Sequence, residues 1–125
     1  MSLQDLPNNA ESERAVLASI SLSRGGVVDE AIEVLGSDGS MFYQESYKRI
    51  YEAMLGLHQQ GASIDPAALL GVIQDSPTLL VLANIHEACP TSANLMHYAR
   101  QVLKAWQQRE LILEAKRLEA GILQG

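Results

Sequence analysis

Apolar residues recur at helical spacing along almost the whole chain, and no segment alternates apolar and polar positions as a strand does. Glycine, proline and serine interrupt this pattern, so we expect about five short helices and then a longer one. The short helices are expected at about residues 9–21, 27–35, 44–60, 66–75 and 78–88. The sequence therefore predicts an all-α fold with a small orthogonal helical bundle.

Local signals indicate where several of these helices begin and end. Asn8, with Glu11 three residues later, is expected to cap the first helix. Asp65 followed by Pro66 is the clearest start signal, because the carboxylate caps free amides and proline tolerates the first helical position. The pair Ser76-Pro77 is expected to end the fourth helix.

The longest expected helix occupies the C-terminal stretch. After Pro90 there is no proline and no glycine until Gly121, and Thr91 and Ser92 offer hydroxyls for an N-cap. A helix of roughly 30 residues is about 45 Å long at ~1.5 Å per residue. A compact domain of this size is roughly 36 Å across. We therefore divide the chain into a globular head, residues 1–90, and a long helix, residues 91–125, which either overhangs the head or bends back over it.

The apolar stripe on this long helix changes side. At ~100° per residue one face carries Leu95, Ala99, Val102 and Trp106. A second set lies roughly 160° away and consists of Leu111, Ala115, Leu118 and Ile122. We expect the first set to pack on the head and the second set to be a self-association surface. A kink at Gln107-Gln108, or a helix folded back on the head, would be consistent with the same pattern.

Charge and composition narrow the classes of partner. Residues 1–90 carry four Lys or Arg against twelve Asp or Glu, a net charge of −8, whereas residues 91–125 carry five against three, a net charge of +2. The acidic head would repel phosphate backbones, so we expect DNA binding to be weak or indirect. No run of about 18 apolar residues and no signal pattern is present, which predicts a cytoplasmic protein that does not enter membranes.

The sequence contains no pattern typical of catalysis. A phosphate loop needs glycines, a lysine and a Ser or Thr at fixed spacing, and the nearest stretch, residues 36–40, lacks the lysine. His58, His86 and His97 are expected on three different helices, without a partner at metal-ligand spacing. Cys89 is interpreted as a buried thiol. We therefore predict no catalytic, cofactor-binding or metal-ligating residues, and no enzyme activity for this stretch.

A series of short motifs follows the chain in a characteristic order. They are Leu6-Pro7-Asn8-Asn9-Ala10-Glu11-Ser12-Glu13 with Ala15-Val16-Leu17, then Phe42-Tyr43, Ile50-Tyr51, Ala53-Met54 and Leu57, then Ile64-Asp65 and Leu69, and after Pro90 the pairs Ala93-Asn94 and Tyr98-Ala99 with Val102. Together they resemble the N-terminal domain of the bacterial replicative DNA helicase, the DnaB family, over roughly residues 5–120. Two positions depart from the family pattern: Tyr47 replaces a usual His, and Ser76-Pro77 replace a common Gly-Gly pair.

The resemblance implies a helical head followed by a hairpin that dimerises with the hairpin of a second subunit. In such helicases these domains form a collar above the motor ring, where they support dimer and hexamer assembly and dock primase; a helicase loader is a further partner. ATP and Mg²⁺ would be used only by the motor domain, which this stretch lacks. The chain stops where the second arm of the hairpin would begin, as in an excised fragment or a short protein of a mobile element.

A second interpretation comes from a different class. The chain could be a stand-alone helical DNA-binding or regulatory protein of a phage or mobile element. Such a protein needs a basic recognition helix, and the only candidate runs from Arg100 to Arg117, whose positive residues point in several directions. An enzyme is a third interpretation that no constellation of residues supports.

Overall fold

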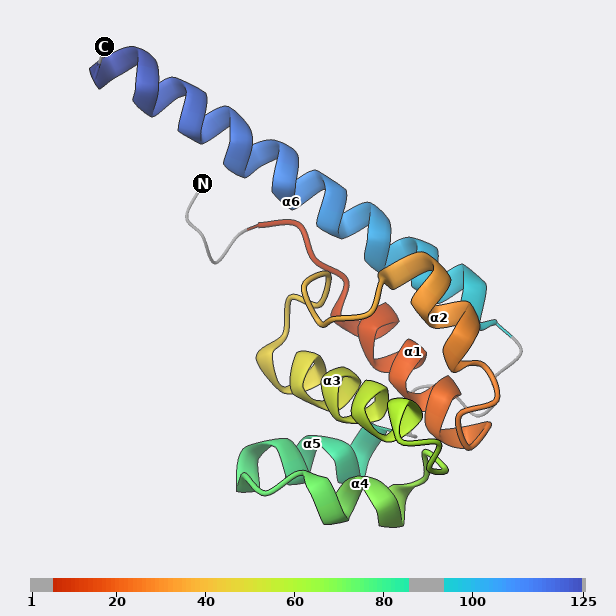
Figure 1. Cartoon of the computed structure of the whole chain (residues 1–125). Coiled ribbons are helices and arrows are strands. Elements are labelled where there is room, and N and C mark those ends of the chain that lie inside the picture. The colour runs from red at the N-terminus through yellow and green to blue at the C-terminus, as the bar shows by residue number, and fades with distance from the viewer. Residues whose placement is uncertain (1–5, 86–93, 125) are drawn as a thin grey trace.

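The structure is a computed structural model that describes residues 6–85 and 94–124, with side chains described as far as Gly121 (Figure 1). The helices in these ranges are α1 (Ala10–Leu22), α2 (Val28–Leu35), α3 (Glu45–Gln59), α4 (Pro66–Val72), α5 (Ser76–Asn84) and α6 (Leu95–Gln124). The described ranges contain no strand. The all-α prediction, with five short helices followed by one long helix, is confirmed.

The first helix begins one residue later than predicted. Asn9, and not Asn8, is the N-cap of α1, because its side-chain oxygen accepts a hydrogen bond of 3.0 Å from the backbone N–H of Ser12. The Asn8 amide instead donates to the carbonyl of Leu6. The capping prediction for Asn8 is therefore wrong, although a cap of the expected chemistry is present next to it.

The boundary between the fourth and fifth helices also differs from the prediction. Asp65 caps α4 through a 2.9 Å hydrogen bond from the amide of Ala68, as expected. However, α4 ends at Val72, and Ser76-Pro77 form the first turn of α5 instead of ending α4. The reason is a second cap: Asp75 accepts a 3.0 Å hydrogen bond from the amide of Thr78, and the proline occupies a position that needs no donor. The predicted remainder of the fifth helix, after residue 85, lies outside the described residues.

The helices of the head stack in layers. The long helix α6 packs on α1 and α2, α1 packs on α3, and α3 covers both α4 and α5 (Figure 1). The interior between these layers is apolar, and its largest fully buried side chains include Leu17, Ile20, Leu35, Ile50, Tyr51, Met54, Ile64, Leu69, Ile85 and Leu95. Burial of side chains of this size is worth roughly 1.5–3 kcal/mol each, so this interior is the main source of stability.

Tyr51 ties the loop after α2 to the middle of α3. Its side chain is fully buried, its hydroxyl donates a 2.8 Å hydrogen bond to the carbonyl of Gly36, and its ring lies 4.8 Å from the ring of Phe42. Burial raises the pKa of the Tyr51 hydroxyl far above its ordinary value, so this donor keeps its proton. Gly36 adopts a φ of 82°, which glycine accepts without strain and which turns the chain away from α2.

The first half of α6 is part of the core. Leu95, Ala99 and Val102 are buried, as the early apolar stripe predicts. Trp106, expected on the same face, is only half-buried, while Ala105 is 7% exposed. The face of α6 that contacts the head is therefore rotated toward Ala105, compared with the predicted stripe. Arg109, the next residue on that side, makes the hydrogen bonds described below.

Arg109 is the last buried residue of α6, with 6% of its surface exposed. Its Nη1 donates a 3.0 Å hydrogen bond to the carbonyl of Pro7, and its Nη2 donates a 2.9 Å hydrogen bond to the carbonyl of Met41. Its guanidinium also lies 5.0 Å from the centre of the Tyr43 ring. One side chain thus joins α6 to the segment before α1 and to the segment before α3.

Glu13 of α1 holds the same junction from the other side. Glu13 is 1% exposed, and its carboxylate accepts hydrogen bonds from the amides of Tyr43, at 2.9 Å, and Gln44, at 3.1 Å. Gln44 is the N-cap residue of α3 and supplies no capping side chain itself, so the Glu13 carboxylate satisfies amides that lead into α3. Burial raises the pKa of Glu13 above 4.5, and the two amides and the nearby Arg109 charge oppose this rise.

We expect Arg109→Ala to lower the free energy of unfolding by roughly 2 kcal/mol, because two part-buried carbonyls lose their donors. Urea unfolding followed by circular dichroism measures this change. Arg117→Ala is a matched control on the same helix, since Arg117 is exposed and its one ion pair among the described residues is with the exposed Glu114. The control should change stability by less than about 0.5 kcal/mol. Equal stability of the two variants would contradict the role of Arg109.

Candidate interaction surface

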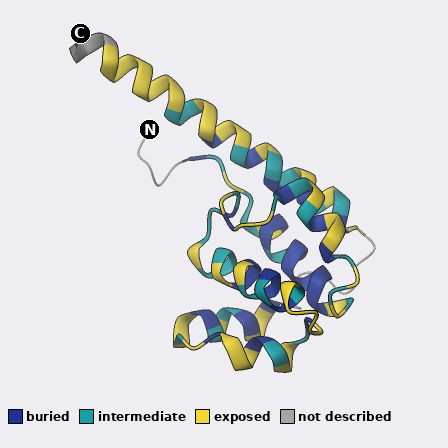
Figure 2. Ribbon diagram, in the orientation of Figure 1, coloured by how far each residue is buried: buried dark blue, intermediate teal, exposed yellow. Residues whose placement is uncertain are grey.

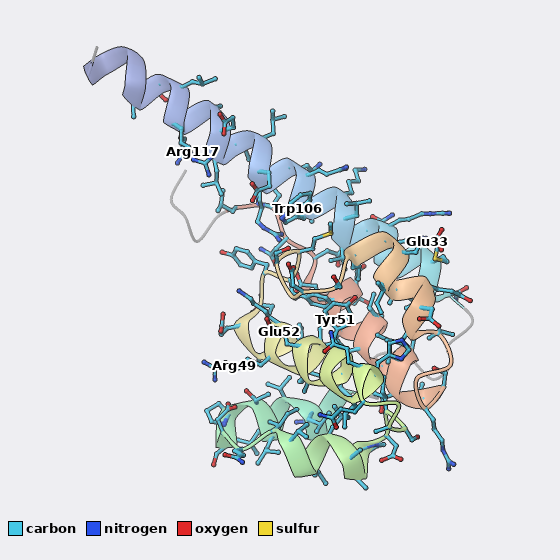
Figure 3. The ribbon with its side chains drawn as sticks, viewed as in Figure 1. Glu33, Arg49, Tyr51, Glu52, Trp106 and Arg117 are labelled. Carbon is cyan, nitrogen blue, oxygen red and sulfur yellow. The ribbon has the colours of Figure 1, made fainter. Side chains whose placement is uncertain are left out.

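The second half of α6 leaves the head and continues as one helix. Figure 1 shows α6 without a kink at its middle, and Figure 2 shows its far half almost entirely exposed. From Glu110 to Gly121 no side chain is buried, and only Ile112 and Leu113 are half-buried. In Figure 3, Trp106 marks where the helix still lies over the head and Arg117 marks the part beyond it. The helix overhangs its domain and does not fold back on it.

The predicted self-association residues lie on this projecting half. Leu111 is 72% exposed and Leu118 is 62% exposed, and Ala115 between them is also exposed. Their spacing of four and three residues places them on one face of the helix. The side chain of Ile122, the fourth predicted member, lies outside the described residues. We call Leu111, Ala115 and Leu118 the distal stripe.

The distal stripe points away from the head. By helical geometry its centre is roughly 160° from the direction of Val102 and Arg109, the two residues that face inward just before it. Two leucines exposed to this degree on a projecting helix form an apolar surface that is costly to leave in water. The arrangement is suited to packing against another helix.

Charged side chains line a neighbouring face of the same segment. Arg117 donates to Glu114 at 2.6 Å, and both side chains are more than half exposed. Exposed pairs of this kind contribute roughly 0–1 kcal/mol, so the pair adds little to stability. It does mark a solvated flank beside the distal stripe, which is the usual arrangement of an apolar contact with a polar rim.

Chemistry-bearing side chains do not gather elsewhere in the described part of the chain. No group of three or more His, Cys, Asp or Glu residues there could hold a metal ion. His58 contacts Asp29 at 3.0 Å, and His97 is exposed with its ring 5.3 Å from the ring of Tyr98. The other candidates, His86 and Cys89, lie outside the described residues, as do the hydroxyls of Thr91 and Ser92. Within the described helices, no span is both long enough and apolar enough to cross a lipid bilayer.

Three charged residues with structural consequences were missed by the sequence analysis. Arg109 was counted as one of several scattered positive charges, although it follows Val102 by seven residues and so continues the buried face. Glu13 was noted only within a motif. Arg14 received no attention, because nothing in its neighbours along the chain shows that its Nε is buried without a hydrogen-bond partner. Only the position of Arg109 gave a readable signal.

The fold and the site together define a class of protein, namely an all-α head with one long helix that projects from it and exposes an apolar stripe. A family model described as the DnaB-like helicase N terminal domain matches residues 5–104. The replicative DNA helicase DnaC of Bacillus subtilis (strain 168) is 34% identical over 115 residues, which are 87% of this chain and 25% of the relative. The replicative DNA helicase DnaB of Treponema pallidum (strain Nichols) is 30% identical over 120 residues, or 91% of this chain and 27% of the relative.

A solved structure has the same fold. The crystal structure of the N-terminal domain of DnaB helicase from Mycobacterium tuberculosis superimposes with a TM-score of 0.82 at 23% identity, covering 95% of this chain and 88% of that chain. This chain belongs to the DnaB-like helicase N-terminal domain family. It spans about a quarter of the length of the curated relatives named above. The family match ends at residue 104, so the distal stripe lies beyond the matched range.

Proposed function

We propose that this chain is the non-catalytic collar domain of a replicative DNA helicase, and that it supports dimer and hexamer assembly through the distal stripe of α6. The observation that carries the proposal is the exposure of Leu111 and Leu118 on the part of α6 that leaves the head. A two-fold contact would cover the same stripe on both copies, because such an interface uses one surface twice. The head then acts as a base that holds the helix in a fixed direction.

The strength of this contact follows from its size. Two copies would cover four leucines, each worth roughly 1.5–3 kcal/mol when fully buried. Association costs roughly 4–15 kcal/mol in lost freedom of movement. These terms are of similar size, so the distal stripe by itself supports a weak dimer. A stable hexamer needs further contacts, which in this proposal come from the second arm of the hairpin and from the motor domain.

We further propose primase as a docking partner, a helicase loader as another, and the cytoplasm as the compartment. The support is membership of the helicase N-terminal domain family and the description of the relatives as replicative DNA helicases. ATP and Mg²⁺ would act in the motor domain only. The sequence of this chain has no phosphate loop that could hold a nucleotide.

The alternative is a stand-alone DNA-binding or regulatory protein. Its candidate recognition helix would need the positive residues of α6 to face DNA. Arg109 is unavailable for this, because it is buried and donates to two carbonyls of its own chain. Arg117 is paired with Glu114, whose negative charge would oppose a phosphate. The assembly function therefore has the stronger support.

We expect the wild-type domain to form a dimer at high micromolar concentration, and Leu111→Glu combined with Leu118→Glu to abolish it. The charges would lie in the contact, where burial of an unpaired carboxylate is strongly unfavourable. Sedimentation or light scattering measures the mass, and circular dichroism checks that the helical fold and its cooperative melting persist.

Two further variants make this test specific. Ala120→Glu adds a charge at an exposed position on the opposite side of α6, so the dimer should remain. Val102→Glu should instead unfold the head, because Val102 is 1% exposed. A wild-type protein that stays monomeric, or a Leu111 and Leu118 double variant that unfolds as Val102→Glu does, would contradict the assembly proposal.

We expect the domain to bind DNA no more tightly than typical non-specific binding, for which Kd is about 10⁻⁴–10⁻⁶ M. The reason is the −8 charge of residues 1–90. Fluorescence anisotropy with labelled duplex and single-stranded DNA at about 150 mM salt measures the affinity. Sub-micromolar binding that Arg100→Gln or Lys104→Gln weakens would favour the stand-alone DNA-binding protein instead.

A further inference from the structure

A second surface feature lies on the far side of the head from α6. A hollow of about 230 Å³ is lined by Arg14 of α1, Tyr47 of α3, and Leu80, Val81 and Asn84 of α5. Its volume is below the roughly 300–1,000 Å³ of typical small-molecule sites. A hollow of this size is suited to a single side chain of a partner and is too small for a cofactor.

Of the polar side chains that line this hollow, Asn84 donates a 3.1 Å hydrogen bond to the carbonyl of Leu80, whereas those of Arg14 and Tyr47 have no described partner. The Nε of Arg14 is buried and makes no hydrogen bond, and within the described residues Arg14 forms no ion pair. The hydroxyl of Tyr47 likewise has no hydrogen-bond partner there. Buried polar groups in proteins are almost always satisfied, so a guanidinium donor without a partner needs an acceptor from outside the described residues. Both groups are donors, and a carboxylate is an acceptor with two oxygens.

No described acidic residue forms an ion pair with Arg14, and two of those nearest along the chain are engaged elsewhere. Glu13, next to Arg14, accepts the amides of Tyr43 and Gln44. Asp75, at the start of α5, caps that helix and lies 3.3 Å from Arg49. The α5 sequence itself has no charged residue, and Arg14 is the only charged residue among the described residues that line the hollow. Among the described residues, the charge of Arg14 is therefore not neutralised by an ion pair.

The walls of the hollow are apolar and open to solvent. Leu80 is 68% exposed, the second-highest exposure among the large apolar residues of the described chain, and Val81 beside it is half-buried. The helix α5 packs on α3 and leaves this side uncovered. An aliphatic chain can lie against Leu80 and Val81 while its terminal carboxylate reaches Arg14, a combination that a bare phosphate ion would not use.

We propose that this hollow binds an acidic residue, flanked by aliphatic residues, from a peptide segment of a partner protein. The acidic side chain accepts from Arg14 and Tyr47, and the aliphatic neighbour covers Leu80. The choice of a peptide over a free anion rests on the exposed apolar wall. The choice of an acidic residue rests on the guanidinium of Arg14, whose buried Nε has no hydrogen-bond partner and which forms no ion pair within the described residues.

The test uses the isotope-labelled domain and two capped peptides, acetyl-Leu-Glu-Leu-amide and acetyl-Leu-Gln-Leu-amide, with inorganic phosphate as a third probe. Two-dimensional ¹H–¹⁵N spectra follow the backbone amides of α1, α3 and α5 and the side-chain Nε–H of Arg14. We expect saturable shifts at these positions with the Glu peptide, and about tenfold weaker binding of the Gln peptide, since a charge-assisted bond is worth at least that factor.

Variants separate the proposed contacts from non-specific effects. Arg14→Gln should weaken binding of the Glu peptide by about tenfold. Arg14→Lys should weaken this binding less, because the positive charge remains although the planar guanidinium is lost. Leu80→Ser should weaken the binding of both peptides by the same factor. Arg100→Gln, an exposed arginine on α6 without a described partner, is the matched control and should change nothing. The same spectra show whether each variant is folded.

Several results would overturn the proposal. One is the absence of a saturable shift at about 20 mM peptide, which is well above the millimolar Kd of a single weak contact. Another is equal binding of the Glu and Gln peptides. A third is binding of the Glu peptide that neither Arg14→Gln nor Arg14→Lys changes. Phosphate binding as tight as that of the Glu peptide would make the hollow a simple anion site. Shifts at the same residues on raising the domain concentration alone would make a second copy of this chain the occupant.

Discussion

The bonds of Arg109 determine how the long helix sits on the head. One guanidinium joins three segments that are far apart in sequence, because it donates to carbonyls before α1 and before α3 from a position on α6. The layered stacking of α6 on α1 and α2 supplies the apolar contact, but apolar contact alone leaves a helix free to slide or rotate. The directional hydrogen bonds define the rotation, and the rotation determines that Leu111 and Leu118 face outward.

Local sequence chemistry predicted the helices well and tertiary chemistry poorly. Asp65-Pro66 was recognised because a cap and a first-turn proline are neighbours in the chain. Ser76-Pro77 was expected to end the fourth helix but begins α5, since proline can follow one helix or start the next. The N-cap Asp75 determines which of the two occurs here.

The two surface features of the head and of α6 also differ in how far the sequence predicts them. The change of side on α6 is a periodic pattern and could be read from the sequence, and Leu111, Ala115 and Leu118 are exposed on one face as that pattern implies. The hollow at Arg14 could not be read, because it is made by three helices that meet only in the folded chain. Sequence reasoning identified the exposed stripe that lies on one helix and missed the hollow that lies between three helices.

Because α6 continues without a break beyond the head, a small change of its angle at the head moves its far end by a larger distance. The last buried residue of α6 is Arg109, and the projecting segment from Glu110 to Gln124 is about 22 Å long at ~1.5 Å per residue. A tilt of about 10° at this junction would displace the tip sideways by roughly 4 Å, about three quarters of the ~5.4 Å pitch of one helical turn. Small changes in how the head holds α6 would thus become larger sideways displacements at the far end, where a neighbouring helix would pack.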